Sequence, residues 1–185
     1  MKRRVYLDHL SGGPLAPEVS AAMRPWLEEI HGNAASLHRH GLKAREALDT
    51  AAAQCAAMIG APADDLVFTS SGTEANNLAV KGVAEAQRER GTHLILSNIE
   101  HPSIDQSVAW LEQQGFTATR VPVDREGRLS VGAVTEAITE QTILIATHHA
   151  SHDLGTVQNL PALGALAGER GIPLLIDATA SGGWL

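Results

Sequence analysis

Residues 172–177 read Ile-Pro-Leu-Leu-Ile-Asp, an apolar run that ends in a carboxylate. Its length and composition predict a buried β-strand with Asp177 at the carboxyl end. An unpaired carboxylate is costly beside so apolar a strand, so Asp177 is expected to have a partner. Two kinds of partner fit: a cationic ring nitrogen of a ligand, or the turn around Thr179, which a strand-end aspartate can cap.

Short apolar runs alternate with helical patterns along the chain, which predicts an α/β fold with a mostly parallel sheet flanked by helices. The expected strands are 66–69, 93–97, 116–123, 142–146 and 172–177. The expected helices are 17–31, 42–59, 73–88, 103–114, 131–139 and 161–170. Residues 1–16 are expected to form an N-terminal arm, and residues 17–185 a single domain.

The composition is that of a globular protein, with 44% hydrophobic residues among 185. A formal net charge of −7 gives no reason to expect nucleic-acid binding. No apolar run approaches the roughly 20 residues of a membrane span, and the basic residues 2–4 lack the apolar stretch of a signal peptide. The single cysteine, Cys55, lies in an alanine-rich helical pattern and is expected to pack rather than react. We therefore expect a cytoplasmic protein.

A second informative stretch is Ser70-Ser71-Gly72-Thr73-Glu74, which joins an expected strand to an expected helix. Small residues at such a turn let backbone N–H groups approach an anion, and the helix N-terminus favours negative charge. Thr73 adds a hydroxyl. The stretch therefore predicts either a phosphate-binding turn or an ordinary capped helix start.

Histidines follow two of the expected strands. His101 comes just after the strand at 93–97, at the strand end where α/β proteins place ligands. Its imidazole could stack on a flat ring or transfer protons, or it could be a solvated or capping residue. Residues 147–153 hold three more histidines, but no second cluster has a matching ligand spacing, so no metal site is expected.

Taken in this order, these residues resemble the cysteine desulfurases of the class V aminotransferase family, fold-type I enzymes that use pyridoxal 5′-phosphate (PLP). The resemblance spans nearly all of the chain. Residues 32–41 match the family pattern G-N-P-x-S-x-H-x-x-G closely. The other matching segments are residues 6–8, which resemble the family's opening strand, and 68–77, 100–102, 155–158 and 177–179.

The resemblance implies roles for five residues. It assigns the PLP phosphate to Gly72 and Thr73, and the face of the pyridine ring to His101. It pairs Asp177 with the ring nitrogen, which would keep the ring an effective electron sink, and it puts His152 beside the ring oxygen. His101 is also expected to move protons during carbon–sulfur cleavage of an amino-acid substrate.

The chain departs from the family at its ring and substrate contacts. His152 stands where the family has an asparagine, and Ala180 stands where it has a glutamine whose side chain donates a hydrogen bond. Residues 9–14, which lie near the substrate in the family, differ from the usual N-A-T-T-P. The substrate is therefore open among cysteine, selenocysteine and other amino acids.

The resemblance also implies residues that this sequence does not contain. The lysine that holds the cofactor's aldehyde as a Schiff base, the arginine that binds the substrate carboxylate and the cysteine that accepts sulfur would all follow residue 185. Residues 17–185 are accordingly expected to form an incomplete PLP-binding large domain without its last strands. We expect an N-terminal subunit or fragment of an enzyme of sulfur or iron–sulfur metabolism, inactive alone. A second polypeptide would complete it in a hetero-oligomer such as α₂β₂. The alternative is a degenerate, non-catalytic module that binds a partner protein.

Overall fold

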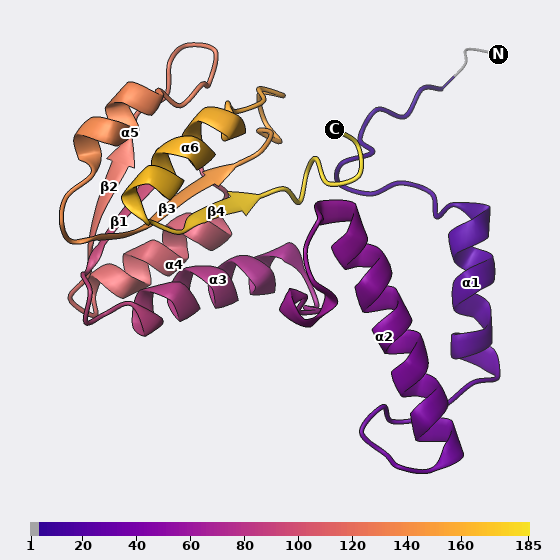
Figure 1. Cartoon of the computed structure of the whole chain (residues 1–185). Coiled ribbons are helices and arrows are strands. Elements are labelled where there is room, and N and C mark those ends of the chain that lie inside the picture. Colours follow the sequence, from indigo (N-terminus) through magenta and orange to yellow (C-terminus); the bar gives the residue numbers. More distant parts are fainter. Residues whose placement is uncertain (1–3) are drawn as a thin grey trace. The chain divides into compact units, whose positions relative to one another are not determined.

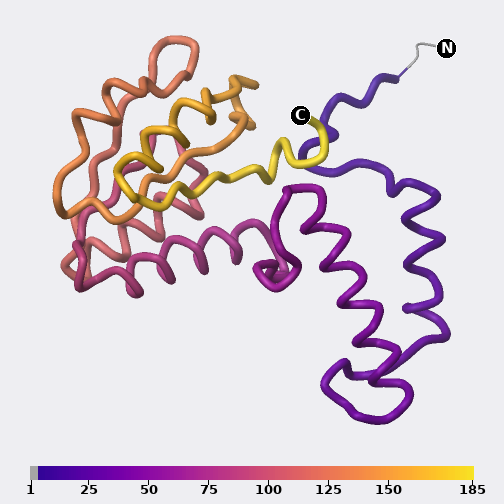
Figure 2. The backbone as a smooth tube through the Cα atoms, in the orientation of Figure 1, coloured from indigo at the N-terminus to yellow at the C-terminus, as the bar shows by residue number. Residues whose placement is uncertain are grey.

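The computed structural model describes residues 4–185, and these form two compact units. One unit covers the described residues up to Phe68, and the other runs from Thr69 to Leu185. The backbone of both can be followed by sequence colour in Figures 1 and 2. The expected division into an arm and one large domain stays a prediction.

The first unit contains two α-helices and a short 3₁₀ helix. Helix α1 (Pro17–Glu28) begins at a proline, whose missing N–H is not needed there, and α2 (Arg39–Ile59) ends at Gly60 in the left-handed conformation. The 3₁₀ helix η1 covers Ala63–Asp65. Both α-helices were predicted from sequence, and their bounds differ from the prediction by three residues at most.

Two expected strands, one in this unit and one at its boundary with the next, are wrong. Residues 6–8 and 66–69 have no regular secondary structure. A strand needs a neighbouring backbone to bond with, and no described residue supplies one to either segment. The Tyr6 hydroxyl instead donates to the nearby carbonyl oxygens of Asp8 and Gly12, at 2.8 and 2.6 Å.

The second unit is a four-stranded parallel sheet with helices on both faces, which confirms the predicted α/β class. Strand order is β2-β1-β3-β4, and every neighbouring pair is parallel. The strands are β1 (His93–Ser97), β2 (Thr117–Val121), β3 (Thr142–His148) and β4 (Leu174–Asp177). The helices are α3 (Gly72–Ala86), α4 (Pro102–Glu112), α5 (Val131–Ala137) and α6 (Leu160–Arg170).

The helices form one layer on each side of the sheet (Figure 1). Helices α3 and α4 pack on one face, where Leu94 and Leu96 of β1 are buried against Ile104 of α4. Helices α5 and α6 cover the other face, where Ile95 is buried against Leu163 of α6. Successive residues of β1 thus point to opposite faces, as a strand covered on both sides requires.

The strand order creates a switch point between β1 and β3. The chain leaves β1 for α4 on one face of the sheet and leaves β3 for α6 on the other. The two connections diverge at the carboxyl ends of these strands, and α/β proteins bind ligands in the crevice formed at such a point. Segments 98–101 and 149–159 and the end of β4 all lie at this edge.

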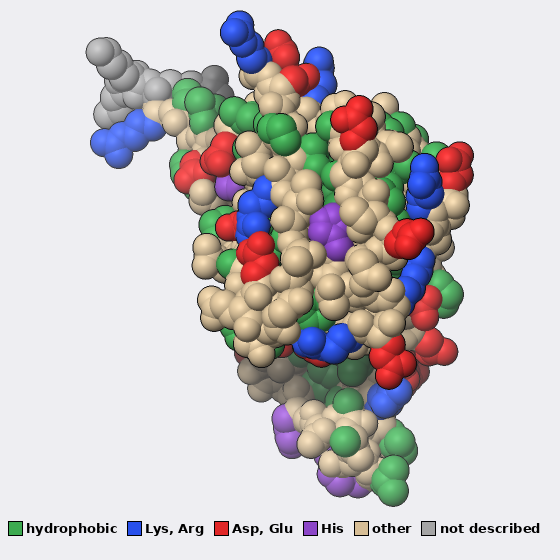
Figure 3. Space-filling model, turned by 90° about the vertical axis from the view of Figure 1, so that its left-hand side faces the viewer, with side chains coloured by type: hydrophobic (Ala, Val, Ile, Leu, Met, Phe, Trp, Pro, Cys, Tyr) green, Lys and Arg blue, Asp and Glu red, His purple; other side chains and the backbone are tan. Residues whose placement is uncertain are grey.

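Two surface properties of the described residues bear on function. On the face drawn in Figure 3, acidic and basic side chains are interspersed, with no concentrated patch of one sign. None of the helices in residues 4–185 combines the length and apolar character that crossing a lipid bilayer requires.

Candidate functional site at the carboxyl edge of the sheet

The turn that leads into α3 is held by a reciprocal cap. The Ser71 hydroxyl accepts the N–H of Glu74 at 3.2 Å, as the helix N-cap. The Glu74 carboxylate reaches back to accept the N–H and the hydroxyl of Ser70, both at 2.6 Å. These hydrogen bonds hold the pKa of Glu74 below its ordinary value. The cap fixes the backbone at residues 70–74, and a capped helix start was one of the two interpretations that the sequence left open.

Gly72 presents open backbone at the first turn of α3. A Cβ at Gly72 would meet the Thr179 side chain, with Oγ1 at 2.7 Å and Cγ2 at 3.1 Å. No hydrogen bond within residues 4–185 uses the N–H of Gly72 or of Thr73. Two donors at the positive end of a helix are therefore left for an anion.

His101 begins α4 and exposes its ring. Its Nδ1 accepts the N–H of Ser103 at 3.1 Å, and the Ser103 hydroxyl lies 2.7 Å from the same nitrogen. The ring of His152, from the segment after β3, lies edge-on to it, with centroids 5.7 Å apart and planes at 63°. The structure therefore brings together two of the predicted site residues from segments about 50 residues apart in sequence.

Asp177 at the end of β4 is half-buried and doubly hydrogen-bonded. Its Oδ1 accepts the N–H of Thr179 at 3.0 Å, and its Oδ2 accepts the side-chain N–H of Asn76 at 2.9 Å. Burial raises the pKa of Asp177, but hydrogen bonding by Thr179 and Asn76 outweighs it and leaves the pKa below its ordinary value; the imidazole of His101, when charged, acts in the same direction. Both partners considered from the sequence are thus compatible with this carboxylate, since it caps the turn and is still partly open to solvent.

Asn76 and Ser103 also belong to the site, and their role was not predicted from the sequence. Each is only 7% exposed, and the Asn76 amide donates to the Ser103 hydroxyl at 2.9 Å as well as to Asp177. They connect α3, α4 and β4 beneath the exposed groups. Nothing local identifies them, because the partners of Asn76 lie 27 and 101 residues away in sequence.

A second buried network lies beside His101. Nδ1 of His148 is 3.0 Å from Oε1 of Glu100, and Nε2 of His148 is 2.9 Å from the Gln158 amide nitrogen. The Gln158 amide also bonds to the N–H of Leu129 and the carbonyl of Gly127, which fixes its orientation. Since the amide nitrogen donates to Nε2, the proton of His148 is on Nδ1 and points to Glu100.

The three histidines of residues 147–153 point to different places. His148 is buried in the network just described, His149 bonds to the Ser181 hydroxyl at 2.9 Å, and His152 is exposed near His101. Among residues 4–185, no group of three or more His, Cys, Asp or Glu side chains is arranged to hold a metal ion.

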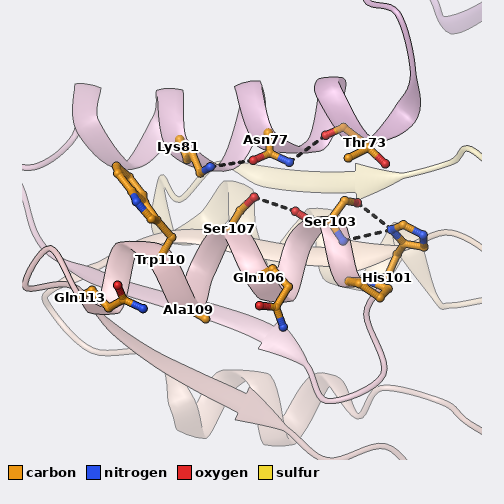
Figure 4. Close-up of a pocket in the computed structure, with 11 residues that line it drawn as sticks. Thr73, Asn77, Lys81, His101, Ser103, Gln106, Ser107, Ala109, Trp110 and Gln113 are labelled. Carbon is orange, nitrogen blue, oxygen red and sulfur yellow. Dashed lines mark hydrogen bonds between the residues drawn. The ribbon is translucent and has the colours of Figure 1, made fainter.

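A groove of about 620 Å³ runs between α3 and α4, next to the turn at Thr73 (Figure 4). Thr73 and His101 line one end. Further along, the amine of Lys81 bonds to Asn77 at 2.7 Å and lies over the Trp110 ring, 4.9 Å from its centroid. The α3 side of the groove is polar, since Thr73, Asn77 and Lys81 line it.

The chain belongs to the class V aminotransferase family, whose sequence pattern matches residues 5–183. The enzymes of this family depend on PLP.

The similar proteins are cysteine desulfurases. The cysteine desulfurase IscS of Dictyoglomus turgidum is 42% identical over 178 residues, which are 96% of this chain and 45% of that protein. The IscS of Pectobacterium carotovorum is 38% identical over 188 residues, covering 100% of this chain and 46% of its own length. This chain therefore spans about half the length of these relatives.

Solved structures give the same result. SspA, solved in complex with cysteine, superposes with a TM-score of 0.89 at 37% identity, over 94% of this chain and 50% of its own. A NifS-like protein superposes with a TM-score of 0.90 at 27% identity, over 95% of this chain and 49% of its own. The fold of the chain is thus part of the fold-type I architecture of PLP-dependent cysteine desulfurases.

Proposed function

We propose that this chain supplies the cofactor-binding half of a cysteine desulfurase-like enzyme. In this proposal the N–H groups of Gly72 and Thr73 and the Thr73 hydroxyl hold the PLP phosphate. His101 lies against the ring face, and Asp177 pairs with the ring nitrogen. The observation that carries the proposal is that all these groups lie at one edge of one sheet within a single compact unit.

The groups that are present fit this cofactor. A phosphate needs backbone donors without a competing side chain, and Gly72 has no Cβ while Thr179 occupies the space beside it. A pyridinium nitrogen needs an ionised carboxylate, and the donors on Asp177 keep it ionised. When bound, PLP supplies an electron sink that stabilises negative charge developing on an amino-acid substrate.

The residues of this chain would orient the cofactor and handle protons. Asp177 would keep the ring nitrogen protonated, and the cap at residues 70–74 would hold the phosphate turn rigid. His101 would exchange protons with the substrate during carbon–sulfur cleavage, because its exposed ring lies at the same edge of the sheet. His152 lies close enough to the His101 ring to contact the same ligand.

We propose an amino acid with a sulfur-bearing side chain, cysteine first, as the substrate. The support comes from the desulfurase relatives and from the cysteine bound to SspA. His152 and Ala180, which replace the asparagine and glutamine of the family pattern, stand near the proposed ring contacts. They are the positions at which a preference for selenocysteine or another amino acid would arise.

We propose that a second polypeptide supplies the lysine that binds the aldehyde. Lys43 lies in α2, and Lys81 is eight residues after Thr73 on α3. At about 1.5 Å per helical residue, Lys81 is roughly 12 Å further along the helix than the phosphate turn. Its amine is already engaged with Asn77 and Trp110. A hetero-oligomer such as α₂β₂ would then be the active species.

A PLP titration of the purified protein tests the cofactor site. Asp177→Asn should weaken PLP binding by about tenfold or more, since a hydrogen bond to a charged group contributes about 1.5–3 kcal/mol. Glu136→Gln, an exposed position on α5, removes the same charge far from the site and should leave binding unchanged. Equal affinities for both variants would remove Asp177 from the cofactor site.

Native mass spectrometry tests the two-chain arrangement. For the protein isolated from its source, the mass of the native complex should exceed the 19.5 kDa of this chain and should include PLP. Borohydride reduction should fix this PLP to a lysine of the other chain. A PLP adduct on this chain would contradict the proposal. A complex with a partner but no PLP would favour the alternative, a non-catalytic partner-binding module.

A further inference from the structure

The buried groups beneath the site form a continuous chain of hydrogen bonds from Asp177 to His101. Oδ2 of Asp177 is 2.9 Å from the Asn76 amide nitrogen, which is 2.9 Å from Oγ of Ser103. Oγ of Ser103 is in turn 2.7 Å from Nδ1 of His101. The last link is visible in Figure 4, where Ser103 makes two contacts with the His101 ring.

Asp177 sets the direction of the first link. Its two oxygens face the N–H of Thr179 and the side chain of Asn76, and an ionised carboxylate only accepts hydrogen bonds. Asn76 must therefore turn its NH₂ group, not its carbonyl oxygen, toward Asp177. The second hydrogen of that NH₂ group points to Ser103.

Ser103 carries the direction onward. Because Oγ of Ser103 accepts from Asn76, its own hydrogen is free to point at Nδ1 of His101. The backbone N–H of Ser103 points at the same nitrogen, 3.1 Å away. Two donors converge on Nδ1, so this nitrogen has no hydrogen of its own.

We propose that Asn76 and Ser103 are positioning residues that hold His101 as the neutral tautomer with its proton on Nε2. A proton on Nδ1 would lose the hydrogen bond from the backbone N–H of Ser103 and would force the Ser103 hydroxyl to turn its own hydrogen away. Nε2 is then the nitrogen that exchanges protons at the exposed face of the ring. This last consequence rests on the proposed function, whereas the tautomer itself does not.

This chain of hydrogen bonds through Asn76 and Ser103, which we call the buried relay, also joins two groups with different proposed roles. Asp177, at one end, is proposed to meet the ring nitrogen of the cofactor, and His101, at the other, the ring face and the substrate. A single buried amide orients both, because Asn76 donates to Asp177 and to the serine that fixes His101. Loss of Asn76 should therefore affect both ends, whereas loss of the Ser103 hydroxyl should affect only the histidine.

Nitrogen-15 NMR of histidine-labelled full chain, without added PLP, tests the tautomer directly. Long-range proton–nitrogen correlations distinguish the two neutral tautomers, and His101→Gln identifies the signals of His101. We expect an unprotonated Nδ1 and a protonated Nε2 in the wild type. A protonated Nδ1 would overturn the proposal.

Two substitutions test the role of the hydroxyl. Ser103→Ala keeps the backbone N–H but removes the O–H donor, so the preference for the Nε2–H tautomer should fall about fivefold, the size of one neutral hydrogen bond. Ser103→Thr keeps a hydroxyl and should restore the wild-type spectrum. An unchanged His101 spectrum in Ser103→Ala would contradict the proposal that the Ser103 hydroxyl stabilises this tautomer.

His93 provides the control for folding in the same spectra. Its ring is buried between Thr142 and Thr119, at 2.8 and 2.9 Å, and its signals should stay fixed in every folded variant. If Ser103→Ala does not fold, the tautomer of His101 in the wild-type protein still confirms or overturns the proposal. PLP binding with the wrong tautomer would refute only this inference, and the right tautomer without PLP binding would refute only the proposed function.

Discussion

Replacing Gly72 by alanine tests whether the phosphate turn depends on close packing against Thr179. The same helix offers a matched control, because Gly82 is exposed and a Cβ there meets nothing within 4 Å. Both substitutions put alanine into α3, Gly82→Ala in its interior and Gly72→Ala at its first position. They therefore differ in the gain in helix propensity and in what the new methyl group contacts.

The expected difference follows from these contacts. Gly82→Ala should stabilise the protein by about 1 kcal/mol, the propensity difference between glycine and alanine in a helix. Gly72→Ala gains less, because it is the first helical residue, and its methyl group would lie 2.7 Å from Oγ1 of Thr179. Overpacking of this kind costs about 1–3 kcal/mol, so the two variants should differ by about 2 kcal/mol.

Urea unfolding measures this difference. With a slope of about 2 kcal/mol/M, a 2 kcal/mol gap separates the two midpoints by about 1 M. Fluorescence of Trp110, on the helix that packs beside α3, reports on the relevant unit when Trp26 and Trp184 are replaced by phenylalanine in every protein compared. PLP binding provides a second readout, because a displaced Thr179 would withdraw its N–H from Asp177. If Gly72→Ala were as stable as Gly82→Ala and bound PLP equally well, the close packing would be unimportant.

Three further predictions concern stability. The pKa of Asp177 lies below the ordinary 3.8, so as the pH falls the unfolded state protonates this carboxylate before the folded state does. The contribution of Asp177 to the free energy of unfolding is therefore complete above pH 3.8 and is lost as the pH falls through the folded-state pKa. In an acid titration of unfolding, Asp177→Asn should give a flatter profile than the wild type. Arg120 forms ion pairs with Asp105 at 2.7 Å and with Glu112 at 3.0 Å, so Arg120→Met should lower the free energy of unfolding in urea by about 1–2 kcal/mol. As the control, Arg45→Met breaks an exposed ion pair with Asp49 and should lower it by no more than about 0.5 kcal/mol. Equal losses in the two variants would contradict this prediction. Ile104 is fully buried, so Ile104→Ala should cost about 2–5 kcal/mol, whereas Leu78→Ala, at a 55% exposed position, should have little effect in the same assay.

The sheet and its helices could be predicted because the information is local. Strand β1 was predicted at residues 93–97 and is found at His93–Ser97, since an apolar run buried on both faces has few alternatives. The N-cap of α3 at Ser71 and the end of α6 at Gly171 likewise depend on residues that are close in sequence. Candidate site residues at strand ends were found for the same reason, because parallel strands bring their carboxyl ends to one edge.

The strand expected at 66–69 shows where local information fails. Leu66, Val67 and Phe68 have the composition of a strand, but strand structure requires a partner backbone. In the described chain these residues have none, and Val67 and Phe68 are 66% and 51% exposed. Apolar character alone therefore predicts that a segment will be buried, but not what will bury it.

Asn76 and Ser103 could not be predicted because their importance lies in tertiary contacts. In sequence each is a polar residue near the start of a helix, which usually means a solvated side chain. Only the packing of α3 on α4 turns them inward, toward each other and toward β4. Glu100 and His148 were equally hidden, since each resembles a polar loop residue until β1 and β3 are paired.

The buried relay also bears on the choice between an enzyme half and a non-catalytic module. A binding module needs a stable scaffold, and a capped turn at Asp177 would suffice for that. It has no need to orient the side chain of an exposed histidine through a buried asparagine and a buried serine. Buried polar groups are costly unless they are hydrogen-bonded. Two such groups serve here to orient His101, which favours a catalytic role for its ring. The tautomer of His101 is therefore the property on which the two interpretations differ most directly.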